Sequence, residues 1–168
     1  MYIPIILGTA REGRFSEKVA NLAMEIAKES GIDSEMVDIR DYRLAATDNI
    51  GNIPQAKKWA EKVNKADALV MVAPEYNHGY SGELKMFLDM LYEEYFGKPV
   101  GLCGVSMGPW GGTRGIQALK LTCLALGMHP ILQAVYVPNI RDAFDEKTFG
   151  KQAKGMLEGL VKLKVAIK

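Results

Sequence analysis

The feature that most limits the fold of this sequence is a repeated alternation between apolar runs and helical patterns. Five apolar runs predict strands at residues 2–7, 34–39, 67–74, 98–105 and 131–137, and helical patterns begin near residues 16, 54, 84, 113 and 144. The runs are almost continuously apolar, whereas a strand with one face in water would alternate polar and apolar residues. We therefore expect strands that are buried on both faces, in a parallel sheet with helices on each side.

The connectivity of the chain then limits the order of these strands. Right-handed crossovers leave few topologies, and five strands with five helices favour the doubly wound order 2-1-3-4-5. Because 168 residues are about one domain's worth, we predict a single three-layer α/β domain over residues 1–168, with a five-stranded parallel sheet in the middle and helices on both faces,. In this order a ligand binds beyond the carboxyl ends of strands one, three and four.

Composition and charge exclude several classes of function. A net charge of +1 gives no reason to expect a nucleic-acid partner, and no apolar run is long enough to cross a membrane,. The first residues, MYIPIILG, lack the basic start of a signal peptide, so we expect a cytoplasmic protein,. Cys103 and Cys123 lie in apolar segments without the spacing of metal ligands, which predicts buried structural thiols and no metal site,.

The loop after the first strand, GTAREGRFSEKVA at residues 8–20, has the composition of an anion site. Thr9 and Ser16 supply hydroxyls, Arg11 and Arg14 supply cations, and a helix that begins at Ser16 would turn its unpaired amides toward the loop,. A phosphate ester is the anion that fits this set best. Taken alone, the loop fits a second interpretation equally well, in which Ser16 only caps the helix and both arginines lie in solvent.

The loop after the third strand, PEYNHGYSGELK at residues 74–85, carries more than a turn requires. Pro74 ends the strand ladder, and the residues after it present backbone N–H and C=O groups at the edge of the sheet,. Tyr76 and Tyr80 add flat faces, and Asn77 can both donate and accept hydrogen bonds,. This loop is suited to a planar ligand with several hydrogen-bonding atoms.

The loop after the fourth strand, SMGPWGGTRG at residues 106–115, has four glycines in ten residues. Such a backbone can pass close to a flat group, and Trp110 could cover one edge of a pocket, although a surface turn with an incidental tryptophan is the alternative. All three loops would meet at one crevice. A flat heteroaromatic ring that bears a phosphate would satisfy them together, so we predict flavin mononucleotide (FMN) as the cofactor.

On these three motifs the chain resembles the NADPH-dependent FMN reductase family of flavodoxin-fold proteins, whose relatives include quinone, chromate and azo-dye reductases. The family patterns are G-S-x-R-x-x-R-x-S, P-E-Y-N-x-x-x-P-x-x-L-K-N-x-x-D and S-x-G-x-x-G-G-x-R, and the second is the specific one. The resemblance covers roughly residues 3–137. Thr9 replaces the usual serine, Ser81 stands where the family often has proline, and Met86 stands where it has asparagine. We expect the last two to affect a subunit contact rather than the flavin.

The resemblance also implies a set of cofactor-binding residues. Those implied for the phosphate and its rim are Thr9, Arg11, Arg14, Phe15 and Ser16; those for the ring and ribityl chain are Pro74, Glu75, Tyr76 and Asn77; those for the pyrimidine end are Ser106, Gly108, Trp110, Gly111 and Gly112. No side chain is assigned as a nucleophile or general acid, because the flavin would carry the redox chemistry. His78 is expected to be structural or to line the rim.

The resemblance further implies an FMN-dependent NAD(P)H oxidoreductase, in which hydride passes from NADPH or NADH to bound flavin and then to a flavin, quinone or similar small-molecule acceptor. The alternative from another class is a flavodoxin-type electron carrier with no enzymatic activity. Flavodoxins are acidic around the flavin, whereas this chain has two arginines in its first loop and no acid in its glycine-rich loop. The helical pattern at residues 84–95 is apolar on more than one face, which predicts a homodimer or homotetramer,.

Overall fold

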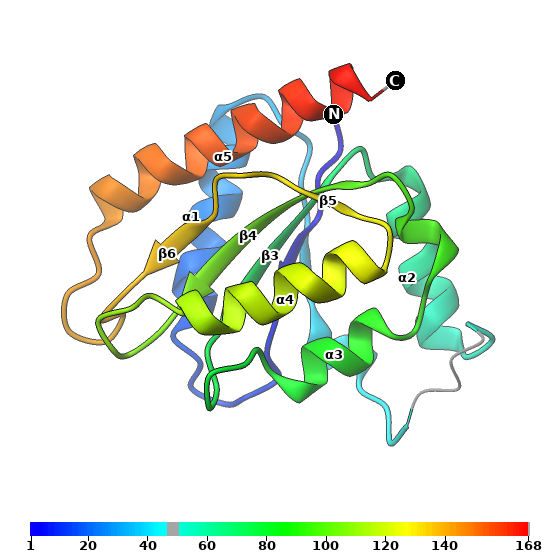
Figure 1. The fold of residues 1–168 in the computed structure, drawn as a ribbon, viewed down its shortest axis with the longest axis horizontal. Helices are drawn as coiled ribbons and strands as arrows, with labels where there is room; N and C mark the ends of the chain where they lie inside the picture. The colour runs from blue at the N-terminus through cyan, green and yellow to red at the C-terminus, as the bar shows by residue number, and fades with distance from the viewer. Residues whose placement is uncertain (47–50, 168) are drawn as a thin grey trace.

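The structure is a computed structural model, and it describes residues 1–46 and 51–167. The predicted irregular segment at residues 41–53 lies partly outside these described residues. The elements, in chain order, are β1 (Ile5–Leu7), α1 (Ser16–Glu29), β2 (Met36–Asp38), the 3-10 helix η1 (Ile39–Tyr42), α2 (Pro54–Lys65), β3 (Leu69–Pro74), α3 (Gly82–Leu88), the 3-10 helix η2 (Glu93–Tyr95), β4 (Pro99–Val105), α4 (Thr113–Ala125), β5 (His129–Pro130), β6 (Val135–Val137) and α5 (Glu146–Ala166) (Figure 1).

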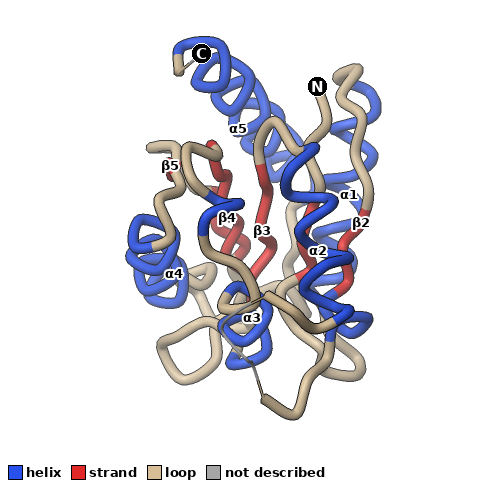
Figure 2. Tube along the Cα trace, turned by 90° about the vertical axis from the view of Figure 1, so that its right-hand side faces the viewer, coloured by secondary structure: helices blue, strands red, loops and turns tan. Residues whose placement is uncertain are grey.

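The sheet has the predicted order, β2-β1-β3-β4-β5, with every pair of strands parallel. The strands lie in the middle of the molecule with helices around them (Figure 2). The α/β fold class, the strand order and the layers predicted from the alternation are therefore confirmed.

Two apolar cores explain why the strands are apolar along their whole length. In β3, Leu69, Met71 and Ala73 face the core shared with α2, α3 and α4. Val70 and Val72, between them, face the core shared with α1 and α5. A strand buried on both faces needs apolar residues at odd and even positions, and β3 has them at both.

The predicted fifth strand, at residues 131–137, is right only over its last three residues. The chain pairs with β4 twice, first through β5 and then through β6, and it bends away from the sheet between them. Leu132, in this bend, is 91% exposed. Both pieces occupy the same edge of β4, so the order of the sheet is unchanged.

The predicted helix at residues 84–95 is also shorter than expected, because α3 ends at Leu88. The chain then turns, and Met90, Leu91 and Tyr95 are buried in the core of the same chain. The extra apolar residues therefore fill a turning segment, and they do not form a second face of one long helix.

Both cysteines lie in the cores, as the sequence indicated. Cys103 in β4 and Cys123 in α4 are almost completely buried and form no disulfide. Burial disfavours the thiolate and raises the pKa of each thiol to about 12,. Within the described part of the chain, no group of three or more His, Cys, Asp and Glu side chains is placed to hold a metal ion, and no helix could span a membrane.

Candidate functional site

A cavity of about 300 Å³ opens at the carboxyl edge of the sheet, where three of the predicted loops meet. It is lined by Arg11, Glu12, Gly13, Arg14, Phe15, Ser16, Pro74, Glu75, Tyr76, Val105, Ser106, Met107, Ile140 and Arg141. Eight of the fourteen predicted cofactor-binding residues are in this set: Arg11, Arg14, Phe15, Ser16, Pro74, Glu75, Tyr76 and Ser106. The remaining six, which are Thr9, Asn77, Gly108, Trp110, Gly111 and Gly112, do not line it.

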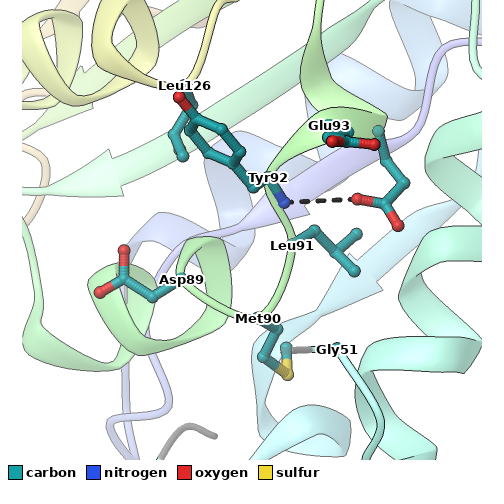
Figure 3. Close-up of a pocket in the computed structure, with 8 residues that line it drawn as sticks. Gly51, Asp89, Met90, Leu91, Tyr92, Glu93 and Leu126 are labelled. Carbon is teal, nitrogen blue, oxygen red and sulfur yellow. Dashed lines mark hydrogen bonds between the residues drawn. The ribbon is translucent and has the colours of Figure 1, made fainter. Parts of the chain in front are cut away.

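A larger hollow of about 600 Å³ lies elsewhere, between the end of α3, η2 and the end of α4 (Figure 3). Its lining includes the carboxylates of Asp89, Glu93 and Glu94, and no predicted site residue. The cavity at the carboxyl edge is smaller, but it lies where a doubly wound sheet binds ligands and it carries arginines. We therefore take the smaller cavity as the candidate site.

Ser16 has an unsatisfied hydroxyl at the floor of this cavity. The residue begins α1 and is 2% exposed, and its Oγ has no hydrogen-bond partner among the residues that the structure describes. A buried hydroxyl without a partner costs stability, and the first amides of a helix have no acceptor within the helix. An anion at this end of α1 would accept from both, so the cavity fits a phosphate group.

Arg14 is held by the protein itself. Its Nη1 donates to the carbonyl oxygen of Thr9 at 2.6 Å and to Oδ1 of Asp38 at 2.8 Å, its Nη2 donates to Oδ2 of Asp38, and its Nε donates to Glu17 at 3.3 Å. These four contacts occupy most of the guanidinium. Burial alone would raise the pKa of Asp38, but the hydrogen bonds from Arg14 and from the Arg40 amide lower it,. Arg14 therefore fixes the shape of the loop after β1.

Arg11 is the freer of the two arginines in this loop. Its guanidinium lies 5.8 Å from the ring centre of Tyr76, a cation–π contact that joins the loop after β1 to the loop after β3,. The hydroxyls of Thr9 and Tyr76, 2.9 Å apart, make a second link between the same loops. Thr9 is fully buried, so its hydroxyl serves this link and does not face the cavity.

The loop after β3 is shaped by a tight turn. Tyr76 and Gly79 exchange two backbone hydrogen bonds of 2.8 and 2.9 Å, and Asn77 and His78 between them both have positive φ. Positive φ at both central residues is the geometry of a type I′ turn, which asparagine tolerates well. Asn77 and His78 therefore form the tip of the turn.

Glu75 connects the loop after β3 to α4. Its amide donates to the carbonyl oxygen of Val105 at 2.9 Å, and its Oε2 accepts from the amide of Gly115 at 3.0 Å. A carboxylate near the first turn of a helix is stabilised by the unpaired amides there. One carboxylate oxygen of Glu75 is thus occupied by a contact within the protein, which fixes the direction of the side chain.

Two glycines of the loop after β4 pack closely against backbone atoms of the protein itself. Gly111 and Gly112 have φ of +60° and +83°, and a Cβ on Gly112 would lie 2.9 Å from the amide nitrogen of Val105. Trp110 is 66% exposed and does not cover the cavity. In this loop only Ser106 and Met107 reach the cavity.

A fourth loop, which the sequence analysis missed, completes the wall. Ile140 and Arg141 follow β6 and line the cavity. The sequence does contain a sign of this loop, which is the turn-rich segment PNIRD at residues 138–142, directly after the last strand. Because the last strand pairs with β4, the segment after it lies beside the loop after β4. Its turn residues and its cation lie at the same carboxyl edge as the loops after β1, β3 and β4.

Ser81, which stands where the resembled family often has proline, is buried in the protein interior. It is 1% exposed, its Oγ donates to the carbonyl oxygen of Gly8 at 2.7 Å, and it accepts from the amide of Leu84 at 3.1 Å. Ser81 thus caps α3 and holds the first residue of the loop after β1. Its φ of −66° is one that proline also adopts, which explains how either residue fits here,.

Replacing Ser81 by alanine is expected to lower the free energy of unfolding by about 1–2 kcal/mol, because α3 loses its cap and the buried carbonyl of Gly8 loses its donor. Urea denaturation followed by circular dichroism measures this change. The matched control is Ser30→Ala, since Ser30 is exposed at the end of α1 and should change stability by less than about 0.5 kcal/mol,. Equal effects of the two substitutions would contradict the role given to Ser81.

Comparison with known proteins identifies the chain's family. A family model described as NADPH-dependent FMN reductase matches residues 1–142. An NAD(P)H-dependent FMN reductase of Schizosaccharomyces pombe is 35% identical over an alignment 149 residues long, which covers 81% of this chain and 73% of the relative. An FMN-dependent NADPH-azoreductase of Staphylococcus aureus is 36% identical over an alignment 112 residues long, which covers 62% of this chain and 60% of the relative.

Solved structures agree on the fold. The flavoenzyme FerB, an NAD(P)H:(acceptor) oxidoreductase from Paracoccus denitrificans, superposes with a TM-score of 0.79 at 21% identity, over 96% of this chain and 97% of FerB. A flavodoxin from Streptococcus pneumoniae superposes with a TM-score of 0.65 at 14% identity, over 96% of this chain and 99% of the flavodoxin. At these identities the likeness shows a flavodoxin-like fold alone. Because the family model spans most of the chain, this protein belongs to the NADPH-dependent FMN reductase family.

Proposed function

We propose that the protein is an FMN-dependent NAD(P)H oxidoreductase that holds FMN in the cavity at the carboxyl edge of the sheet. When bound, FMN supplies the redox chemistry, accepting hydride from a nicotinamide and passing electrons to a flavin, a quinone or a similar acceptor. The family and the curated relatives support this activity. The protein's part is to bind the cofactor, orient it and leave one face of the ring open to substrates.

The observation that carries the placement of FMN is the unpartnered hydroxyl of Ser16. In this proposal the phosphate accepts hydrogen bonds from Ser16 Oγ, from the amide of Ser16 at the start of α1 and from Arg11. Arg14 holds the backbone of the loop through Thr9, and Phe15 lines the rim. The anion thus replaces water at a helix N-terminus, where its charge is favoured.

The ring end of the proposed site is formed mostly by backbone. Pro74, Glu75, Tyr76 and Ser106 line the cavity beyond the phosphate end, and the side chain of Glu75 is already bonded to Gly115. Backbone amides aimed at the pyrimidine oxygens would stabilise negative charge that develops there. We propose that Asn77, Gly108, Trp110, Gly111 and Gly112 act through the shape of these loops.

No protein side chain is proposed as a nucleophile or general acid. Among the described residues that line the cavity there is no histidine, cysteine or lysine. The family argues against a flavodoxin-type electron carrier, because the family model and the curated relatives are described as NAD(P)H-dependent reductases, whereas the likeness to a flavodoxin is one of fold alone.

Substitution of Ser16 tests the phosphate site. Ser16→Ala is expected to weaken FMN binding about fivefold to tenfold and to leave riboflavin binding unchanged, since riboflavin lacks the phosphate. Quenching of flavin fluorescence by the apo-protein measures both affinities. The matched control is Ser34→Ala, because Ser34 carries the other buried hydroxyl without a described partner and lies away from the cavity.

The same preparation tests the activity. Anaerobic addition of NADPH to the FMN-loaded protein should bleach the visible flavin absorbance rapidly, and an acceptor such as a quinone should restore it. A flavin that stays oxidised with both NADPH and NADH would contradict the proposed activity. Equal loss of FMN and riboflavin affinity in Ser16→Ala would instead contradict only the placement of the phosphate.

We also propose a single FMN-binding domain over residues 1–168, a cytoplasmic location and a homodimer or homotetramer. Support for an oligomer comes from exposed apolar side chains on neighbouring elements, which are Tyr92 and Phe96 beside η2 and Leu121 and Leu124 on α4. Light scattering on the purified protein determines the oligomeric state.

A further inference from the structure

Arg141 stands on a backbone that is tied to the loop after β4. The amide of Asn139 donates to the carbonyl oxygen of Gly108 at 3.0 Å, and the amide of Ile140 donates to that of Ser106 at 3.1 Å. Ile140 is buried, and the amide of Ala143 closes the turn onto the carbonyl of Asn139 at 2.9 Å. The base of the Arg141 side chain is therefore well fixed at the wall of the cavity.

The guanidinium of Arg141 is held only by soft contacts. It lies 5.6 Å from the ring centre of Phe15, and its Nη2 lies 3.7 Å from the sulfur of Met107. No carboxylate of the described residues forms an ion pair with it. Contacts of an exposed guanidinium with an aromatic ring or a thioether are weak, so the group can leave Phe15 for an anion at little cost.

The charges around the cavity leave two arginines for a ligand. Arg14 is paired with Asp38 and Glu17. The carboxylates of Glu12 and Glu75 also belong to residues that line the cavity, but among the described residues neither forms an ion pair with an arginine, and Glu75 is bonded to the amide of Gly115. Arg11 and Arg141 remain, each resting on an aromatic ring, Tyr76 for one and Phe15 for the other. A phosphate monoester carries a charge of about −1.5 to −2 near pH 7, more than Arg11 alone neutralises.

We propose that Arg141 is a phosphate-binding residue, which leaves Phe15 and closes on a phosphate monoester in the cavity. The proposal rests on the proposed function and adds to it a binding residue from outside the three sequence motifs. Two ligands of the proposed enzyme carry such a phosphate monoester: the cofactor FMN, at its 5′ position, and the co-substrate NADPH, at its 2′ position. Both would gain a charge-assisted, bidentate contact with the guanidinium, a contact that riboflavin and NADH lack.

The test uses Arg141→Met, which removes the charge but keeps an apolar stem against Phe15. The matched control is Arg43→Met, which makes the same change of charge at an exposed arginine that does not line the cavity. If Arg141 binds the cofactor, the affinity of the apo-protein for FMN should fall about fivefold to twentyfold while riboflavin affinity is unchanged. If it binds the co-substrate, KM should rise by a similar factor for NADPH and not for NADH.

A third variant separates charge from shape. Arg141→Lys should recover part of the lost affinity, because it restores the charge without the planar fork. Arg141 is not a phosphate-binding residue if Arg141→Met leaves both ratios, FMN to riboflavin and NADPH to NADH, as in the wild type. Equal losses for the phosphorylated and unphosphorylated ligands would also overturn the proposal. Failure of the wild-type protein itself to bind FMN would be a different result, since it contradicts the proposed function.

Discussion

Replacing Gly104 by valine is expected to abolish FMN binding and to lower the free energy of unfolding by more than about 3 kcal/mol. Gly104 lies near the carboxyl end of β4, and a Cβ there would stand 2.5 Å from the carbonyl oxygen of Gly111 and 2.8 Å from Cγ1 of Ile116. The carbonyl belongs to backbone that cannot turn aside as a flexible side chain would. The loop after β4 would have to move away from the strand, and this would displace Ser106 and Met107, which line the cavity. Urea denaturation and flavin fluorescence quenching measure the two effects.

The control for this prediction is Gly108→Ala in the same loop. A Cβ on Gly108 meets nothing within 4 Å, and its φ is not in the left-handed region. Its stability should change by less than about 0.5 kcal/mol. A Gly104→Val protein that folds and binds FMN like the wild type would show that the loop after β4 does not pack on the strand as described.

The second large effect is expected for Arg14→Ala. The substitution removes both hydrogen bonds to the Asp38 carboxylate and the one to the carbonyl of Thr9, and it leaves that carboxylate half-buried without its cation. We expect the free energy of unfolding to fall by about 2–4 kcal/mol. FMN affinity should fall as well, because the loop that presents Ser16 loses its internal support. Arg14→Lys should recover little, since an ammonium group cannot donate to both oxygens and to Thr9 at once.

The dependence of this effect on pH provides an independent check. The pKa of Asp38 is lowered in the folded protein, so its contribution to stability is present above the ordinary carboxyl pKa of about 4 and is lost as the pH falls through the folded value,. The stability difference between the wild type and Arg14→Ala should therefore shrink below about pH 4. A double-mutant cycle with Asp38→Ala should show a coupling energy of about 1–3 kcal/mol, and additive effects would contradict the pair.

Much of the fold could be predicted from the sequence, because its determinants are local or repetitive. Burial on both faces makes a strand such as β3 apolar at every position, and the right-handed crossover then leaves one main order for the sheet,. Helix starts were also well predicted. Ser16 and Pro54 begin α1 and α2 as expected, and a proline suits the first turn of a helix,.

What could not be predicted depends on contacts between distant residues. The sequence predicts Arg14 as a phosphate ligand, because nothing near it in the sequence indicates Asp38, which is 24 residues away and reaches it only through the pairing of β1 and β2. The glycines at 111 and 112 predict space for a ligand, whereas residues of β4 and β6 lie against them. The end of α3 at Leu88 depends on the core that buries Met90 and Leu91, and this core is invisible to local helical spacing.

The burial of both thiols makes the protein convenient to label. With pKa values near 12, Cys103 and Cys123 are almost wholly protonated at neutral pH, and maleimides react with thiolates,. A single cysteine introduced at an exposed position such as Leu132 would therefore take up a fluorophore without prior removal of the native pair. A dye placed there would report on association between copies of the chain while the cavity stays untouched.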